Sequence, residues 1–388
     1  MLHVISGIEP ESGGPTVALE GLCGALLRGG HAISLVATWK YRSSFANAER
    51  LRAAGAMVDL LGPAPWPFRS HPQLADTLRA RLAEADVMHV HALWEEIEYL
   101  GPRIARERGV PYVWTPHGLL DRFNMRRNYP FKRAMLAWRV RGVLQTAAAI
   151  HAASEFERDQ IARWRLRPPI EVIGFGVDAR FHAARPPRGA LRRSIGLADD
   201  APVVLFLGRI QHGKGADVLA RAFRSVRTPG ARLVIAGPSE GPLADTLRRE
   251  VAAAGLADRV LFTGLLDRGR AIEAIVDADV LAAPSAHESF GIAVAEALTL
   301  GTPVVVSDQV GLAGLVRGRD LGRVAPAEPA ALARALDELL ADRPALRAMS
   351  DRAAAVGRER FDWDGVRDEW MALYERIARA GGPSNARP

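Results

Sequence analysis

Short apolar segments alternate with helix-like segments along this chain of 388 residues, and no other feature restricts the fold as strongly. Each apolar segment is rich in Val, Ile and Leu and is bounded by glycine or proline, as buried strands of parallel sheets are. Strands separated by helices form βαβ units, so the sequence predicts an α/β fold with parallel sheets. The expected strands are Leu2–Ser6, Ile33–Thr38, Met57–Leu61, Val87–Val90, Tyr112–Thr115 and Ala149–Ala152, then Val203–Leu207, Leu233–Ala236, Val260–Thr263, Val280–Ala283 and Val304–Ser307.

The two series of strands predict two domains of similar size. A chain of this length is too long for one ordinary core, and the irregular segment 174–187 is the natural boundary between the series. We therefore expect two doubly wound, Rossmann-like domains, residues 1–178 and 179–360. The last segment, Trp363–Ala378, has apolar residues at helical spacing and predicts an amphipathic helix.

Composition indicates a cytoplasmic protein. No run of apolar residues is long enough for a transmembrane helix, and no leader-like segment is expected at the start. The single cysteine, Cys23, lies in a helix-like apolar stretch and is expected to be a small core residue in a reducing compartment.

Positive charge is concentrated in one segment. Lys and Arg outnumber Asp and Glu by 51 to 44, and the excess gathers in Arg122–Arg141, where aromatic residues lie between the cations. Two interpretations stay open: a patch for an anionic acceptor or for the inner face of a membrane, with peripheral attachment, and a plain solvated helix face. A nucleic-acid-binding module has only the charge in its favour, because a recognition helix, an aromatic RNA-binding strand and zinc ligands are all missing from the sequence.

In doubly wound folds, ligands bind beyond the carboxyl ends of the strands, and the first such loop contains Gly13-Gly14. Glycines let backbone N–H groups approach a phosphate closely, and Pro15 suits the start of the helix that follows. A dinucleotide-binding site would need G-x-G-x-x-G here and an acid after the second strand, which instead runs into Trp39-Lys40. Bound NAD is therefore not expected.

The loop Gly208–Gly215 follows the first strand of the second domain. Arg209 and Lys214 lie on it and are suited to gripping a diphosphate from two sides, the alternative being two ordinary exposed cations. The sequence of the loop nearly matches the P-loop motif, but Gly215 occupies the position where a P-loop needs Ser or Thr to hold magnesium. A P-loop NTPase is thus disfavoured.

Two further loops carry candidate site residues. His117 follows the strand Tyr112–Thr115, where it is placed either to bond a sugar hydroxyl, to relay a proton, or to cap the loop. Glu288 lies in the loop after Val280–Ala283, and Glu296 lies in the second turn of the helix expected from Ile292 to Leu300. That helix start offers N–H groups to a phosphate, and Glu296 can accept hydrogen bonds from a diol such as a ribose, the alternative being an arginine partner within the protein.

Glu288 and Glu296 form a Glu-x7-Glu motif within His-Glu-Ser-Phe-Gly-Ile-Ala-Val-Ala-Glu-Ala. With Gly13-Gly14, His117-Gly118 and the Arg209 to Lys214 loop, this motif resembles the retaining glycosyltransferases of family 4, the bacterial group 1 glycosyltransferases. The resemblance extends over nearly the whole chain. This chain departs from the family pattern at Gly174-Phe175-Gly176-Val177-Asp178, where relatives usually have the sequence Pro-Asn-Gly-Val-Asp.

The resemblance implies the GT-B fold, in which two Rossmann-like domains face a central cleft and a final helix, about 361–380, crosses back to the first domain. It implies an acceptor-side first domain and a second domain that binds a UDP- or GDP-linked sugar. Arg209 and Lys214 would bind the diphosphate, Glu296 the ribose and Glu288 the sugar, assisted by backbone at Phe290, Gly291 and Ile292. His117 would lie beside the sugar.

The implied activity is the retaining transfer of a sugar to a glycan or lipid-linked acceptor, in cell-surface polysaccharide biosynthesis. The resemblance implies no cofactor and no metal, because the two cations stabilise the leaving diphosphate. Two Asp-x-Asp triplets, Asp277/Asp279 and Asp362/Asp364, do not have the placement of a metal site. A nucleotide-sugar epimerase or a phosphorylase-like enzyme of the same fold is the alternative function.

Overall fold

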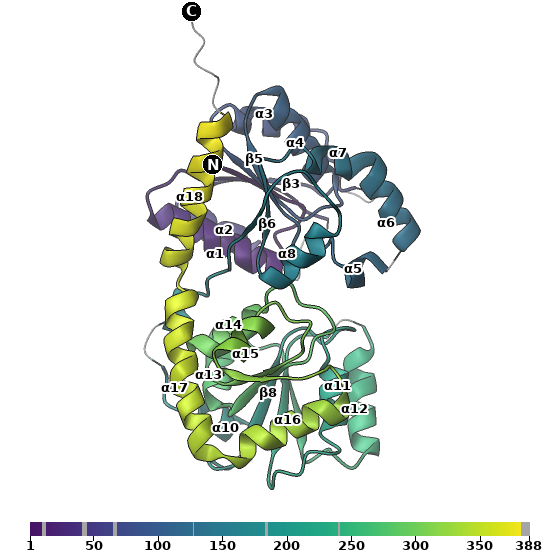
Figure 1. The fold of residues 1–388 in the computed structure, drawn as a ribbon, viewed down its shortest axis with the longest axis vertical. Coiled ribbons are helices and arrows are strands. Elements are labelled where there is room, and N and C mark those ends of the chain that lie inside the picture. Colours follow the sequence, from purple (N-terminus) through teal and green to yellow (C-terminus); the bar gives the residue numbers. More distant parts are fainter. Residues whose placement is uncertain are drawn as a thin grey trace, which may run out of the picture. The chain divides into compact units, whose positions relative to one another are not determined.

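The computed structural model describes residues 1–9, 13–40, 45–64, 68–126, 128–182, 185–239 and 241–381, and the chain divides into two compact units (Figure 1). Unit 1 comprises Met1–Gly176 with Trp363–Pro388, and unit 2 comprises Val177–Asp362. Each unit holds one sheet whose paired strands are all parallel. The expected α/β fold with parallel sheets is confirmed.

The sheet of unit 1 has seven strands in the order β3-β2-β1-β4-β5-β6-β7. Their bounds are β1 (Leu2–Ile5), β2 (Ser34–Thr38), β3 (Met57–Leu61), β4 (Met88–His91), β5 (Tyr112–Thr115), β6 (Ala149–Ala152) and β7 (Ile170–Val172). The helices are α1 (Gly14–Arg28), α2 (Ala46–Ala53), α3 (Leu74–Leu82), α4 (Glu96–Glu107), α5 (Arg122–Arg126), α6 (Tyr129–Met135), the π-helix η2 (Leu136–Val140), α7 (Arg141–Leu144), α8 (Glu155–Ala162) and α18 (Trp363–Gly381).

The sheet of unit 2 has six strands in the order β10-β9-β8-β11-β12-β13. Their bounds are β8 (Val203–Leu207), β9 (Arg232–Ala236), β10 (Val260–Gly264), β11 (Val280–Ala283), β12 (Val304–Val306) and β13 (Gly322–Val324). The helices are α9 (Ala179–His182), α10 (Ala190–Ser194), α11 (Ala216–Ala222), α12 (Leu243–Ala253), α13 (Arg268–Asp277), α14 (Ile292–Thr299), α15 (Ala313–Gly318), α16 (Pro329–Ala341) and α17 (Arg343–Arg360).

All eleven expected strands are present, and the structure adds β7 and β13. Each of these two strands has three residues, lies at the edge of its sheet and is mostly only partly buried. Segments this short and this exposed give no apolar run for the sequence to reveal.

The last helix, α18, belongs to unit 1 and packs against α1 (Figure 1). Its first residue, Trp363, is buried against two glycines of the same unit, Gly21 and Gly176, where an added Cβ would collide with the indole ring. The return of the final helix to the first domain, expected from the sequence, is therefore seen. The chain divides after Gly176 and Asp362, whereas the expected divisions were after 178 and 360.

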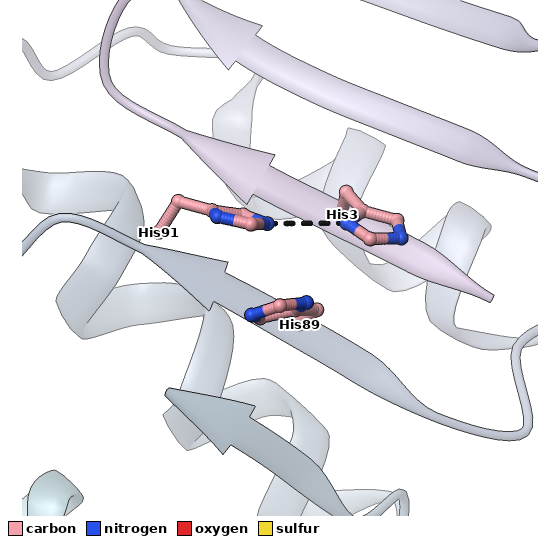
Figure 2. A group of neighbouring side chains, drawn as sticks. All are labelled: His3, His89 and His91. Atoms are coloured by element: carbon pink, nitrogen blue, oxygen red, sulfur yellow. Dashed lines mark hydrogen bonds between the residues drawn. The ribbon is translucent and has the colours of Figure 1, made fainter. Parts of the chain in front are cut away.

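One face of the unit 1 sheet carries polar residues where buried parallel strands usually carry apolar ones. His3 of β1 is in register with His89 of β4 (Figure 2). On the next strand pair, His91 is in register with Thr115 of β5. His151 of β6 continues the series, and all five side chains are buried. We call these five residues the histidine row.

A chain of hydrogen bonds joins α18 to this row. The Tyr374 hydroxyl lies 2.7 Å from Nδ1 of His89, and Nε2 of His89 lies 2.6 Å from Oγ1 of Thr115. Oγ1 of Thr115 lies 3.0 Å from Nδ1 of His151, whose Nε2 lies 2.7 Å from the carbonyl oxygen of Ile173. That carbonyl can only accept, so His151 donates from Nε2 and accepts from Thr115. It follows that His89 donates to Thr115, and Tyr374 donates to His89.

Burial keeps the four histidines of the histidine row, and His117 beside them, neutral. It lowers the pKa of His3 and of His117 to about 3 and that of His151 to about 4. Burial, followed by the neighbouring imidazoles, lowers the pKa of His89 and of His91 well below 6.5. Neutral rings with one donor and one acceptor nitrogen each are what such a hydrogen-bonded chain requires.

We expect Tyr374→Phe to lower the free energy of unfolding of unit 1 by about 1–3 kcal/mol, because Nδ1 of His89 loses its donor in a buried place. All eight tryptophans lie in unit 1, so the intrinsic fluorescence during urea unfolding reports on that unit. Tyr99→Phe is the matched control, because the hydroxyl of the partly buried Tyr99 makes no hydrogen bond with another described residue. Equal losses in both variants would contradict a role for the Tyr374 hydroxyl.

We also expect unit 1 to lose stability as the pH falls from about 7 towards 5. The unfolded chain binds protons on its histidines near pH 6.5, whereas five buried histidines of unit 1, those of the histidine row and His117, stay neutral until far lower pH. Glu98 opposes this trend, because burial raises its pKa to about 7 and the folded state therefore binds one proton there that the unfolded chain does not bind until lower pH. Each net proton changes the free energy of unfolding by roughly 1.4 kcal/mol per pH unit. A fluorescence-monitored unfolding free energy that stays constant between pH 7 and 5 would contradict this expectation.

Candidate functional site

The loops at the carboxyl ends of β8, β11 and β12 are tied to one another in unit 2. The amide of Ala286 donates to the carbonyl of Gly213 at 2.8 Å, which joins the β11 loop to the β8 loop. Glu288 donates through its amide to Gln309 at 3.0 Å and accepts from the amide of Gly311 at 2.8 Å, which joins it to the loop after β12. The backbone that carries the sequence-predicted residues is thus fixed on several sides.

Gly215 is required by this arrangement. Its φ is +85°, and a Cβ at this position would collide with the carbonyl oxygen of Pro284 in the β11 loop. A Ser or Thr in its place would be strained and would have no room. The residue that sets this loop apart from a P-loop therefore lets the β8 and β11 loops approach each other.

Lys214 and Glu288 form an ion pair between Nζ and Oε2. Each side chain is 26% exposed, so the pair lies within reach of a ligand. Arg209, on the same loop as Lys214, is also partly exposed. The structure brings Lys214 and Glu288 together although 74 residues separate them in the chain.

Glu296 lies in the second turn of α14 and is partly buried. Its carboxylate makes no hydrogen bond or ion pair with another described residue, and burial raises its pKa to about 7. Arg268 is the cation whose charge acts on Glu296, but its guanidinium pairs with Asp178 at 3.0 Å. The alternative of an arginine partner for Glu296 thus finds no support among the described residues.

The N-terminus of α14 is not capped by a side chain of the residue that precedes it. Gly291 precedes the helix with a φ of +105°, and the first amides of the helix have no carbonyl to pair with inside it. The ring of Phe290 is buried and contacts Phe361 edge to face at 6.0 Å, so only its backbone is placed to meet a ligand. Ile292 is the first residue of the helix.

In unit 1, Gly13 precedes α1 with a φ of +75°, and Gly14 is the first residue of that helix. The carbonyl of Gly13 accepts from the Thr16 hydroxyl at 2.8 Å. The loop is therefore a glycine turn into a long helix, as expected, and the amides at this start have no side-chain cap either.

His117 follows β5 with a φ of +52°, in the left-handed region that few residues other than glycine adopt. Its Nε2 lies 3.1 Å from Nδ1 of His91, so it extends the histidine row. The ring is nearly parallel to that of His91, at a centroid distance of 5.3 Å, and to that of Phe175, at 6.0 Å. His117 is partly exposed, whereas the row behind it is buried.

Phe175 also explains the segment that departs from the usual pattern of relatives. Besides stacking on His117, its ring lies 5.6 Å from that of His151. The next residue, Gly176, leaves room for the indole of Trp363. Gly174-Phe175-Gly176 therefore supports His117 and seats the first residue of α18.

The basic segment Arg122–Arg141 covers α5, α6, η2 and the start of α7, and its Arg127 lies outside the described residues. Four aromatic side chains of the segment are exposed: Phe123 by 44%, Tyr129 by 43%, Phe131 by 57% and Trp138 by 81%. Arg139 is engaged within unit 1, because it pairs with Glu96 and lies over the ring of Tyr99 at 4.4 Å. No described helix is both long and apolar enough to cross a membrane.

The Asp-x-Asp triplets have other partners. Asp279 pairs with Arg188, Arg192 and Arg343, and Asp277 accepts from the amide of Arg192 at 3.0 Å. Asp364 is exposed and pairs with two arginines of unit 1. Among the described residues, the one group with ligand atoms close enough for a metal ion is His3, His89 and His91.

Sequence reasoning missed the histidine row. A signal was present in Met88-His89-Val90-His91, where two histidines alternate with apolar residues and must share one face of a strand. His3 and His151 stand alone in their strands, and only the sheet order brings them beside this pair.

Comparisons with known proteins agree with this geometry. The family described as "Glycosyltransferase Family 4" matches residues 12–181, and the family "Glycosyl transferases group 1" matches residues 187–356. The chain is 34% identical to D-inositol 3-phosphate glycosyltransferase of Jonesia denitrificans over 75% of this chain and 72% of that protein. It is also 34% identical to 2-deoxystreptamine N-acetyl-D-glucosaminyltransferase of Streptomyces fradiae over 70% of this chain and 66% of that protein.

Among solved structures, HepE of Anabaena, in complex with UDP and glucose, aligns with a TM-score of 0.79 at 19% identity. The alignment covers 97% of this chain and 99% of that one, which confirms the expected GT-B fold. Two family matches that together cover most of the chain, with relatives above 30% identity, settle the membership. The chain belongs to the group 1 glycosyltransferases.

Proposed function

We propose that this glycosyltransferase moves a sugar, with retention, from a UDP- or GDP-linked donor to a glycan or lipid-linked acceptor in cell-surface polysaccharide biosynthesis. The proposal of a nucleotide-sugar donor rests mainly on the environment of Glu296. A partly buried carboxylate without a partner among the described residues, next to a helix start, is costly to the fold unless a ligand uses it. A ribose diol supplies the two hydroxyl donors that such a carboxylate lacks.

Arg209 and Lys214 are proposed to hold the diphosphate. Lys214 already pairs with Glu288, and an ammonium has three N–H donors, so it can keep this contact while it binds a phosphate oxygen. Glu288 would then orient the sugar instead of acting as a nucleophile. As the bond from the anomeric carbon to the diphosphate breaks, these two cations stabilise the charge on the leaving oxygen, and a metal ion is not needed.

The acceptor hydroxyl attacks the same face of the sugar, and its proton passes to the leaving diphosphate. In this proposal, unit 1 binds the acceptor, unit 2 binds the donor, and His117 contacts the sugar. An epimerase or a phosphorylase-like enzyme would handle the same donor differently. Release of free nucleoside diphosphate that depends on an added acceptor would favour transfer over both.

We expect Arg209→Ala and Glu296→Gln each to raise the dissociation constant for the nucleoside diphosphate about 10- to 100-fold, as the loss of a charged hydrogen bond does. Glu288→Gln is expected to leave that constant nearly unchanged and to slow transfer, because Glu288 faces the sugar. Calorimetric titration with UDP and with GDP measures the dissociation constants, and acceptor-dependent release of nucleoside diphosphate measures transfer. The control is Arg224→Ala, which changes an exposed arginine of unit 2. Unchanged affinity in both of the first two variants would refute the assignment of the donor site.

We further propose that the basic segment attaches the protein peripherally to an anionic membrane surface on the cytoplasmic side. Exposed aromatic rings between cations suit the interface of a bilayer, and Arg122 and Arg126 are exposed. Arg139 is left out of this surface because of its partners within unit 1.

A variant with Arg122→Gln and Arg126→Gln is expected to bind vesicles of mixed phosphatidylglycerol and phosphatidylcholine about 30-fold more weakly, at roughly 1 kcal/mol per cation. Cosedimentation measures the bound fraction. The control, Arg106→Gln with Arg108→Gln, removes the same charge from exposed positions at the end of α4. Equal binding by both double variants would show that the segment is an ordinary solvated face.

A further inference from the structure

A second chain of hydrogen bonds leads from the core of unit 1 to its surface. Nδ1 of His3 lies 3.1 Å from Nε2 of His91, and Nδ1 of His91 lies 3.1 Å from Nε2 of His117 (Figure 2 shows the first contact). His3 and His91 are buried, and His117 is partly exposed. Nδ1 of His117 has no hydrogen-bond partner among the described residues, so the chain ends at a nitrogen that is available to a ligand.

The group His3, His89 and His91 does not suit a metal ion in this arrangement. Both nitrogens of His89 already bond within the first chain, to Tyr374 and Thr115. The ring of His89 stacks on that of His91 at a centroid distance of 4.0 Å. Figure 2 shows the two rings beside each other, and lone pairs in the planes of stacked rings do not converge on one point. The hydrogen-bonded arrangement accounts for these side chains better than a metal site does.

The buried end of the chain fixes the position of its protons. A neutral imidazole carries one N–H, and Nε2 of His3 is buried without a partner. An unpaired buried N–H is rarer in folded proteins than an unpaired acceptor, so Nε2 of His3 is assigned the lone pair and Nδ1 the proton. His3 then donates to Nε2 of His91, and His91 donates from Nδ1 to Nε2 of His117. The remaining proton of His117 is therefore on Nδ1.

We propose that His3 and His91 are positioning residues that hold His117 as its Nδ1–H tautomer, so that His117 donates a hydrogen bond to a sugar oxygen of the substrate and does not act as a base. This assignment of a partner to His117 rests on the proposed function, whereas the tautomer does not. The left-handed backbone of His117 and the contacts of its ring with those of His91 and Phe175 hold the imidazole in one orientation. A fixed donor of this kind supports positioning and charge stabilisation, and it removes no proton from the acceptor.

The tautomer can be measured on the free protein. Long-range ¹H–¹⁵N correlation spectra of ¹⁵N-histidine-labelled protein at pH 7.5 distinguish a protonated ring nitrogen from an unprotonated one, and His117→Gln assigns the signals. We expect Nδ1 of His117 to be protonated and Nε2 to be unprotonated. A wild-type spectrum with the proton on Nε2, or with both nitrogens protonated, overturns the proposal whether or not the variants below fold.

Two variants of similar size test the role of His91. His91→Asn keeps an N–H near the position of Nδ1 and is expected to preserve the tautomer, whereas His91→Leu removes this donor and is expected to shift His117 towards Nε2–H. Tryptophan fluorescence confirms that each variant is folded. An unchanged His117 spectrum in folded His91→Leu would show that His91 does not set the tautomer.

Kinetics connect the tautomer to the reaction. We expect His91→Leu to lower the turnover of UDP-glucose or GDP-mannose, measured as release of free nucleoside diphosphate, about tenfold, the value of one hydrogen bond of 1.4 kcal/mol. The dissociation constants for UDP and GDP should not change, and His91→Asn should restore turnover. If the protein binds no nucleotide at all, the donor assignment fails, and the spectra still decide the tautomer. Equal turnover in the Leu and Asn variants would contradict a positioning role.

Discussion

The row of neutral histidines across the unit 1 sheet is the interaction on which the rest of that unit depends. A buried sheet face normally excludes polar side chains because each unpaired group costs free energy. Here the rings pair with one another, with Thr115 and with the hydroxyl of Tyr374, so the face is polar and largely satisfied at once. Because Tyr374 comes from α18, the last helix holds His89, and the ring of His89 stacks on that of His91, which bonds to His117.

Unit 2 meets a different constraint, the close approach of loops at the carboxyl ends of its strands. Left-handed glycines allow it: Gly215 makes room for Pro284, and Gly291 turns the chain into α14. The approach brings Lys214 to Glu288 and leaves Glu296 without a partner among the described residues. The site thus combines a cation that is already paired with an acid that has no partner among the described residues. In the proposed function, a diphosphate sugar would offer a charge to the first and hydroxyls to the second.

The sequence predicted most of the fold because buried parallel strands and amphipathic helices leave strong local patterns. Eleven strands, the helix with Glu296 and the final helix were foreseen, whereas β7 and β13 were not, being short edge strands. In the site, Glu288, Glu296, Arg209 and Lys214 could be named from motif and loop position. The ion pair of Lys214 with Glu288 could not be foreseen, nor could the pairing of Arg268 with Asp178, because both depend on distances between distant loops. The histidine row escaped for the same reason, since strand order decides which histidines become neighbours.

The return of α18 also determines the order in which the chain can fold during synthesis. Unit 2 is inserted within unit 1, and its two ends are held together, since the amide of Val177 donates to the carbonyl of Phe361 at 2.9 Å. All of unit 2 leaves the ribosome before Trp363, Trp370 and Tyr374 do. Unit 2 can therefore complete its core while unit 1 still lacks the helix that covers its histidines. The half of the protein that is synthesised first is the half that is finished last.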